Sequence, residues 1–176
     1  VIRRELGMSL PNQGHYFNSD SLYKRFTPAG PDHAQVAACA GMADYVDEVY
    51  AHHFDAEAAP AERCAQVHDL FRAHEVQLTQ PILDYLLAKN SAQLIGPTSA
   101  QDRAPTIAVK LQIPGEEAAK KLAPFGVMAG GGDFYAVRPL QAMNISPEHG
   151  VLRLSFVHYT GPKDVDRLLS ALDHVL

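Results

Sequence analysis

One arginine, Arg153, lies within a run of residues, VLRLSF, that is otherwise typical of a buried β-strand. Successive side chains of a strand point to opposite faces of the sheet, so Leu152 and Leu154 share one face and Arg153 lies on the other. A guanidinium in such a strand requires an anionic partner, because burying an unpaired charge costs much free energy. Two partners are open: an Asp or Glu of this chain, or a ligand carboxylate, which a guanidinium binds through two parallel hydrogen bonds.

A glycine-rich stretch, AGGGDF (129–134), is the second candidate. It lacks the lysine and the following helix that give a phosphate-binding loop its affinity. Glycine has no Cβ, so the stretch fits either a close approach of two backbones or the border of a ligand cleft.

Nine histidines are present, but their spacing does not favour a metal site. His52 and His53 are adjacent and point to different sides of a helix, and His68 and His74 do not share a face. We interpret them as solvated or capping side chains and expect no metal ligand. The sequence also contains no spacing typical of a Ser-His-Asp or Cys-His nucleophile.

The composition is that of an ordinary globular protein, with 176 residues, 47% of them hydrophobic, and a formal net charge of −5. No block of Lys and Arg favours nucleic acid or an anionic membrane as a partner. The longest apolar run, 36–43, is far too short for a membrane span. Cys39 and Cys64 indicate no disulfide framework, so we interpret both as small buried hydrophobic side chains and the location as the cytoplasm.

The elements that position these residues begin after an irregular start. The chain opens VIRRELG, with neither an initiator Met nor a signal pattern, and we interpret it as processed or as a piece of a longer protein. The first thirty residues show no sustained period, and we expect them to pack through their aromatic side chains, which are Tyr16, Phe17, Tyr23 and Phe26.

Two long helices are expected next. Asp32 is a plausible N-cap for a helix over 31–54, and its apolar stripe is Val36, Cys39, Ala40, Ala43, Val46, Tyr50 and Phe54. Pro60 suits the first turn of the second helix, which we expect to end at Asn90. Pro81 removes a backbone donor and should kink or split that helix.

Short strands and helices alternate after residue 90. Strands are expected over 92–97, 106–113 and 151–159, and helices over 115–126, 137–144 and from Pro162 onward. This order predicts an α/β chain with an α+β small domain, in which long connecting helices precede a small sheet with helices packed on one face.

The sequence GVLRLSFVHYTGPKDVDRLLSAL resembles the end of class V aminotransferases of the cysteine desulfurase-like branch, which are pyridoxal phosphate enzymes of fold type I. Further matching stretches are KRFTPAGPDHAQVAACAGMADYV, LIGP, APTIAVKL and GDFYAVRPL, in the same order and spacing. The resemblance implies a C-terminal portion, with residues 1–31 ending the large cofactor-binding domain, 32–90 forming connecting helices and 91–176 forming the small domain.

The resemblance also implies a substrate site. Arg153 would hold the α-carboxylate of an amino acid, and Tyr135 and Gly131 would shape the substrate side. Gly30 stands where relatives carry a threonine that contacts the cofactor phosphate, so only its backbone N–H could do so. The family implies pyridoxal 5′-phosphate as cofactor, transamination or a related elimination, and a homodimer with active sites at the interface.

Departures from the family narrow this expectation. The Schiff-base lysine lies before this chain would begin, so we expect no catalytic residue here and an inactive chain by itself. Tyr135 stands where desulfurases carry their persulfide-forming cysteine, so we expect no sulfur transfer through it. The alternative is a catalytically silent α/β interaction or regulatory domain in which Arg153 pairs internally.

Overall fold

The computed structural model describes residues 2–26 and 32–176 and divides the chain into two compact units, Val1–Cys64 and Ala65–Leu176. The boundary between the units falls within the long helix α4 (Pro60–Leu87). Across the described ranges, no helix is both long enough and apolar enough to cross a membrane.

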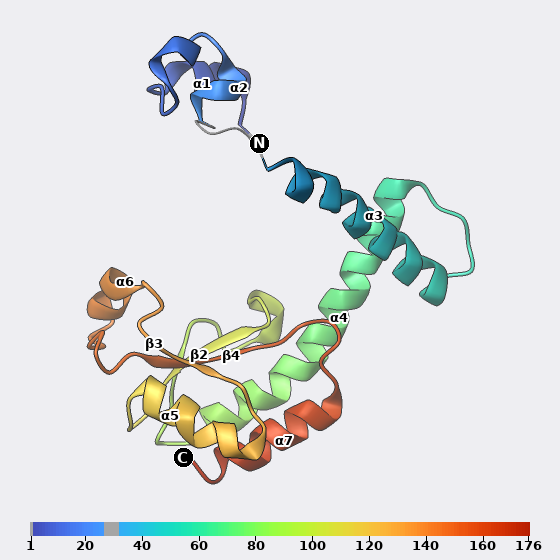
Figure 1. Ribbon diagram of the computed structural model, residues 1–176. Coiled ribbons are helices and arrows are strands. Elements are labelled where there is room, and N and C mark those ends of the chain that lie inside the picture. Colours follow the sequence, from blue (N-terminus) through green and yellow to red (C-terminus); the bar gives the residue numbers. More distant parts are fainter. Residues whose placement is uncertain (1, 27–31) are drawn as a thin grey trace. The chain divides into compact units, whose positions relative to one another are not determined.

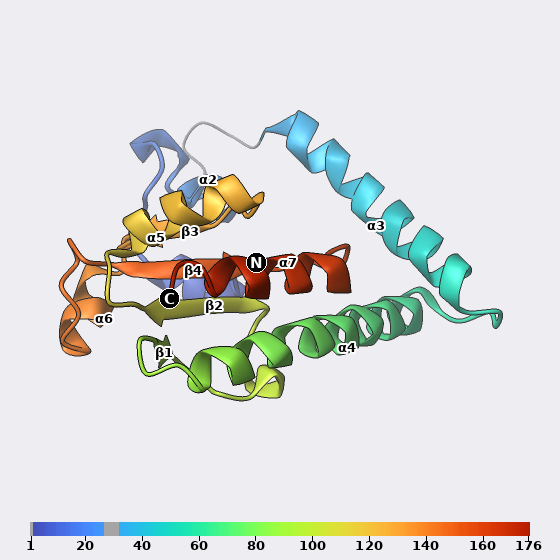
Figure 2. The same ribbon diagram turned by 90° about the horizontal axis from the view of Figure 1, so that it is seen from below.

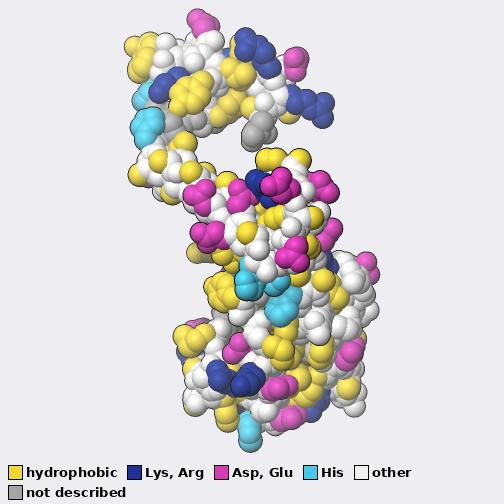
Figure 3. Space-filling view, turned by 90° about the vertical axis from the view of Figure 1, so that its right-hand side faces the viewer, with side chains coloured by type: hydrophobic (Ala, Val, Ile, Leu, Met, Phe, Trp, Pro, Cys, Tyr) yellow, Lys and Arg dark blue, Asp and Glu magenta, His cyan; other side chains and the backbone are white. Residues whose placement is uncertain are grey.

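The start of the first unit contains three short helical turns: α1 (Arg4–Ser9), η1 (Tyr16–Asn18) and α2 (Leu22–Arg25). Hydrophobic side chains show at the surface of this segment in the upper part of Figure 3. Tyr16, Phe17 and Tyr23 are 86%, 68% and 60% exposed, so the expectation that they pack the segment is wrong. Turns this short supply no second layer to cover the rings; instead Arg25 holds the segment by donating hydrogen bonds to the Ser19 and Leu10 carbonyls.

Helix α3 (His33–His53) begins as expected. The Asp32 carboxylate accepts hydrogen bonds from the Ala34 and Gln35 N–H groups, which would otherwise lack partners at a helix start. Of the expected apolar stripe only Tyr50 is buried. Cys39 and Cys64 are both exposed and free, so their interpretation as buried side chains is wrong: a helical apolar period indicates a face, not what covers it.

Helix α4 runs unbroken from Pro60 to Leu87, so the expected split at Pro81 does not occur and the helix ends before Asn90. Pro81 removes one donor, but its neighbours Ile82 and Leu83 are fully buried. Their packing against the sheet stabilises the helix through the proline, because tertiary burial outweighs the loss of one hydrogen bond.

The second unit contains a four-stranded sheet of order β1-β2-β4-β3 in which each adjacent pair is antiparallel (Figure 1). Its strands are β1 (Gln93–Ile95), β2 (Thr106–Lys110), β3 (Gly130–Gly132) and β4 (Val151–Ser155). Three of them confirm the expected strands at shorter lengths, and β3 was expected only as a loop. Strand β4 is interior, with a partner on each side.

Three helices cover one face of this sheet: α4, α5 (Gly115–Leu122) and α7 (Pro162–Leu172), as Figure 2 shows. Their apolar side chains form the main core with Ile107, Val109, Leu152 and Leu154 of the sheet. On the other face, α6 (Val137–Ala142) contributes to a smaller cluster of Leu140, Ile145 and Val151. The expected fold class, long helices followed by a small sheet with helices on one face, is confirmed.

Candidate functional site

Arg153 lies at the centre of β4, opposite Ala108 on β2 and Gly130 on β3. Leu152 and Leu154 on either side of it are buried in the main core, whereas Arg153 is exposed on the other face, as strand alternation predicts. Because its two cross-strand neighbours are alanine and glycine, no bulky side chain stands opposite Arg153 on β2 or β3.

The guanidinium of Arg153 has no carboxylate partner within the described ranges, where neither an ion pair nor a hydrogen bond engages it. The guanidinium instead contacts an aromatic ring: the Arg153 Cζ atom lies 4.1 Å from the centroid of the Phe134 ring. A guanidinium carries five N–H donors in a fixed planar fork. All of them are therefore available to an anion from outside this part of the chain.

Ser155 and Val151 share the face of β4 that carries Arg153, one on each side of it along the strand. Ser155 and Thr106 are cross-strand partners, and the Thr106 hydroxyl donates a hydrogen bond to the Ser155 hydroxyl at 3.4 Å. The Val151 cluster lies at the other end of the strand. A cation between a hydroxyl pair and an apolar cluster is suited to a small organic anion, such as a carboxylate with a short side chain.

The other expected site residues occupy different places. Tyr135 follows Phe134 in a turn where both have positive φ, and its side chain is fully exposed. Gly131 lies opposite Leu152 and packs tightly on the start of α5, on the face away from Arg153. Gly30 lies outside the described residues.

Phe134 and Gly130 lie beside Arg153 and belong to the glycine-rich stretch 129–134, which was expected to border a ligand cleft; their contacts with Arg153 were not expected from the sequence. Three consecutive glycines have poor strand propensity, so pattern analysis does not recognise β3 or the alternation that sets Gly130 beside Arg153. The position of the Phe134 ring follows from a positive φ of 50°, which no sequence period indicates. The one signal in the sequence is the pair of aromatic residues, Phe134 and Tyr135, that follows the glycine triplet and Asp133.

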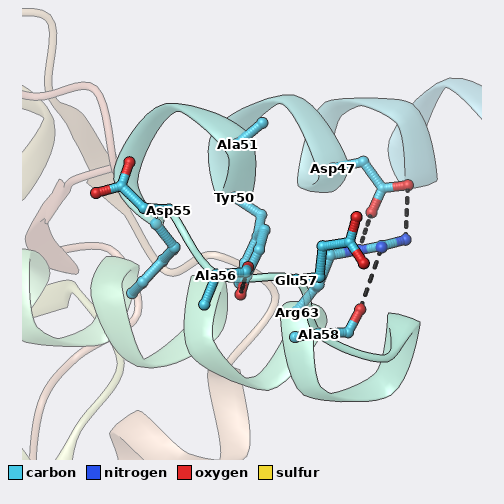
Figure 4. A pocket seen from close by; sticks show the side chains of 9 residues that line it. Asp47, Tyr50, Ala51, Asp55, Ala56, Glu57, Ala58 and Arg63 are labelled. Atoms are coloured by element: carbon cyan, nitrogen blue, oxygen red, sulfur yellow. Dashed lines mark hydrogen bonds and ion pairs between the residues drawn. The ribbon is translucent and has the colours of Figure 1, made fainter.

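A pocket of about 450 Å³ lies in the first unit, at the loop between α3 and α4 (Figure 4). The Arg63 guanidinium binds both carboxylate oxygens of Asp47, at 2.8 and 3.2 Å, and donates a hydrogen bond to the Ala58 carbonyl. The Tyr50 hydroxyl donates to the Ala56 carbonyl at 2.7 Å. The hydrogen bonds of Arg63 and Tyr50 thus fasten the loop between α3 and α4.

The histidines do not gather into a metal site. No group of three or more His, Cys, Asp or Glu side chains with the geometry of a metal site occurs in the part of the chain that the structure describes. The rings of His52 and His53 contact each other edge to face, and His74 Nε2 is hydrogen-bonded to the Thr160 carbonyl at 2.8 Å. That contact joins α4 to the loop after β4.

Comparisons with known proteins agree with this architecture. The family model described as Aminotransferase class-V matches residues 32–168. An aminotransferase-like protein of Gibberella zeae is 26% identical over 95% of this chain, which spans 39% of that protein's length. Among solved structures, a cysteine desulfurase of Thermococcus onnurineus matches 65% of this chain and 29% of its own, with 17% identity and a TM-score of 0.55. The Escherichia coli cysteine desulfurase CsdA matches 69% of this chain and 32% of its own, with 20% identity and a TM-score of 0.51.

Proposed function

Because the chain belongs to the class V aminotransferase family, we propose that Arg153 binds the α-carboxylate of an amino-acid substrate in the complete enzyme. The observation that carries this proposal is the exposed guanidinium on an interior strand, with no carboxylate partner among the described residues. A silent domain with Arg153 paired internally would require an ion pair that those residues do not form.

The proposal concerns the complete protein, since the chain spans 39% of the length of its curated relative. The complete protein would be a homodimeric, cytoplasmic enzyme that catalyses transamination or a related elimination. Pyridoxal 5′-phosphate, when bound, supplies an electron sink for a carbanion at Cα of the substrate.

The residues described here do not by themselves fit that cofactor. Gly30 lies outside them, and Lys89, Lys120 and Lys121 form ion pairs with carboxylates of Asp173, Glu116 and Glu117. In this proposal the chain binds and orients the substrate. Arg153 would fix the carboxylate through two parallel hydrogen bonds, and a substrate so held cannot rotate about that end.

Tyr135 and Gly131 would contribute in different ways. The exposed Tyr135 side chain next to Phe134 would border the substrate, and it supplies no thiol for a persulfide, so we propose no desulfurase activity through this position. Gly131 would act indirectly, because its close packing on α5 fixes β3 and with it the Gly130 position beside Arg153.

The test uses the full-length protein with pyridoxal phosphate and the proteinogenic amino acids, cysteine included. For each substrate consumed, KM is compared between wild type, Arg153→Ala and Arg153→Lys. Losing a charge-assisted contact of about 2 kcal/mol raises KM about 30-fold in the alanine variant, with the lysine variant between. An unchanged KM in the alanine variant would rule out the carboxylate role, and formation of alanine and a protein persulfide from cysteine would contradict the absence of desulfurase activity.

A further inference from the structure

Phe134 holds the guanidinium of Arg153 in a defined place. The Arg153 Cζ atom lies 4.1 Å from the ring centroid, within the range of a favourable cation–π contact. The ring is half-buried and packs against the cluster of Leu140, Ile145 and Val151. The ring is thus anchored on the protein side, while the arginine it contacts is exposed.

The backbone that carries this ring is strained. Phe134 and Tyr135 have φ values of 50° and 60°, a region that bulky residues rarely adopt. Asp133 fixes the turn, because its carboxylate accepts the Tyr135 N–H at 3.0 Å and its carbonyl accepts the Ala136 N–H at 2.8 Å. Strain of this kind persists where the surroundings impose it, and it is concentrated at binding sites.

Gly130 leaves the room that the ring needs. A Cβ atom on Gly130 would lie 3.1 and 3.2 Å from two carbon atoms of the Phe134 ring and 3.9 Å from Arg153 Nη2. The first two distances require the ring to move, whereas the third is ordinary contact. A side chain at Gly130 would therefore disturb the ring before it disturbed the arginine.

From this geometry we infer that Phe134 is a positioning residue, which holds the Arg153 guanidinium by one face and leaves its N–H edges open to a carboxylate. The inference rests on the proposed function of Arg153 and adds the residue that holds its guanidinium in position. A guanidinium already fixed on a ring loses less side-chain freedom when an anion binds, so affinity rises without a further contact to the ligand.

The experiment measures binding of propionate to the full-length protein by calorimetry, with propionamide as the neutral control, and follows the side-chain Nε–Hε NMR signal of Arg153 in the variants that keep this residue. Phe134→Leu keeps an apolar side chain and removes the ring; we expect about 3- to 10-fold weaker propionate binding. Phe134→Tyr restores the ring and should bind as wild type. Gly130→Ala, which requires the ring to shift by a few tenths of an ångström, should weaken binding in the same direction but less than Phe134→Leu.

The Nε–Hε signal also reports the contact directly, since removal of the ring abolishes its ring-current shift. Wild-type affinity in Phe134→Leu, with affinity lost in Arg153→Ala, would overturn the positioning role and leave the proposed function intact. Wild-type affinity in Arg153→Ala would overturn the proposed function itself. If Phe134→Leu does not fold, the inference is tested by comparing Gly130→Ala with Phe134→Tyr. Equal propionate affinity in these two variants would contradict it.

Discussion

Gly131 approaches Gly115 so closely that a Cβ atom on Gly131 would lie 2.1 Å from the Gly115 carbonyl oxygen. This contact sets β3 against the first residue of α5, on the face of the sheet opposite Arg153. Both atoms that meet belong to the backbone or are fixed to it, so neither can move alone. Strand β3, which also carries Gly130, can lie this close to α5 only because Gly131 has no side chain.

Gly131→Ala should therefore destabilise the second unit. Overpacking of this kind costs about 1–3 kcal/mol of unfolding free energy, measurable by urea denaturation. Gly41→Ala is the matched control, because a Cβ there meets nothing within 4 Å and alanine favours the helix. Equal stability of Gly131→Ala and wild type would contradict the close contact.

Asp47 and Arg63 fasten the end of the α3–α4 hairpin through two parallel hydrogen bonds. Asp47→Ala should cost at most about 1 kcal/mol, because the pair is partly exposed to water. The effect should be local: amide hydrogen exchange in the loop 54–59 should quicken. Glu48→Ala is the control, because Glu48 has no such partner in the described part of the chain, and it should leave the loop protected. Equal exchange in both variants would show that the pair does not hold the hairpin.

A surface network joins the ends of α4 and α7, where Asp173 accepts hydrogen bonds from the Tyr85 hydroxyl at 2.7 Å and Lys89 Nζ at 3.0 Å. The Tyr85 hydrogen bond, followed by that of Lys89, lowers the pKa of Asp173. The hydrogen bond to Asp173 raises the pKa of Lys89. Burial, with the hydrogen bond to Asp173 second, raises the pKa of Tyr85.

Because of these pKa shifts, the contribution of the network to the stability of the fold depends on pH. Because the pKa of Asp173 is lowered, this group contributes stability above the pKa of the unfolded chain, and that stability is lost as the pH falls through the folded pKa into the acid range. The raised Lys89 and Tyr85 pKa values contribute stability that is lost at alkaline pH. The Tm difference between wild type and Asp173→Asn should therefore be largest near neutrality and shrink toward both extremes. Asp166→Asn on α7 is the control, and a Tm difference independent of pH would contradict the network.

Both cysteines are exposed and free, so their thiols should be accessible to reagents in solution. Cys39 and Cys64 should react with a thiol reagent in the native protein, and the count of reactive thiols should not rise on denaturation. A native count of zero would show that another surface covers them in the complete protein. Cys39→Ser and Cys64→Ser identify which of the two is covered.

Much of the second unit follows from sequence. The alternation around Arg153 predicts which side chains enter the core, because a central strand covered on one face permits one arrangement. Pro162 predicts the start of α7, where the Gly161 N–H donates to the Asp164 carboxylate at 2.9 Å. Such elements are fixed by local chemistry.

Other features depend on partners far away in sequence. The glycines of β3 form a strand only because β4 offers a paired edge, and Phe134 meets Arg153 only because of a strained turn. Pro81 stays helical because buried neighbours stabilise the helix around it. Periodicity carries no information about these contacts, so the sequence predicts the arginine but not the ring and glycine beside it.

The most direct test of the carboxylate role is a double-mutant cycle on the full-length protein with pyridoxal phosphate. Dissociation constants are measured by calorimetry for an accepted amino acid and for its carboxamide, in wild type and in Arg153→Ala. If Arg153 binds the carboxylate, removal of either partner abolishes the same contact, and the coupling energy should be about 2 kcal/mol. A coupling energy of zero, with Arg153→Ala folded like the wild type, would contradict that role.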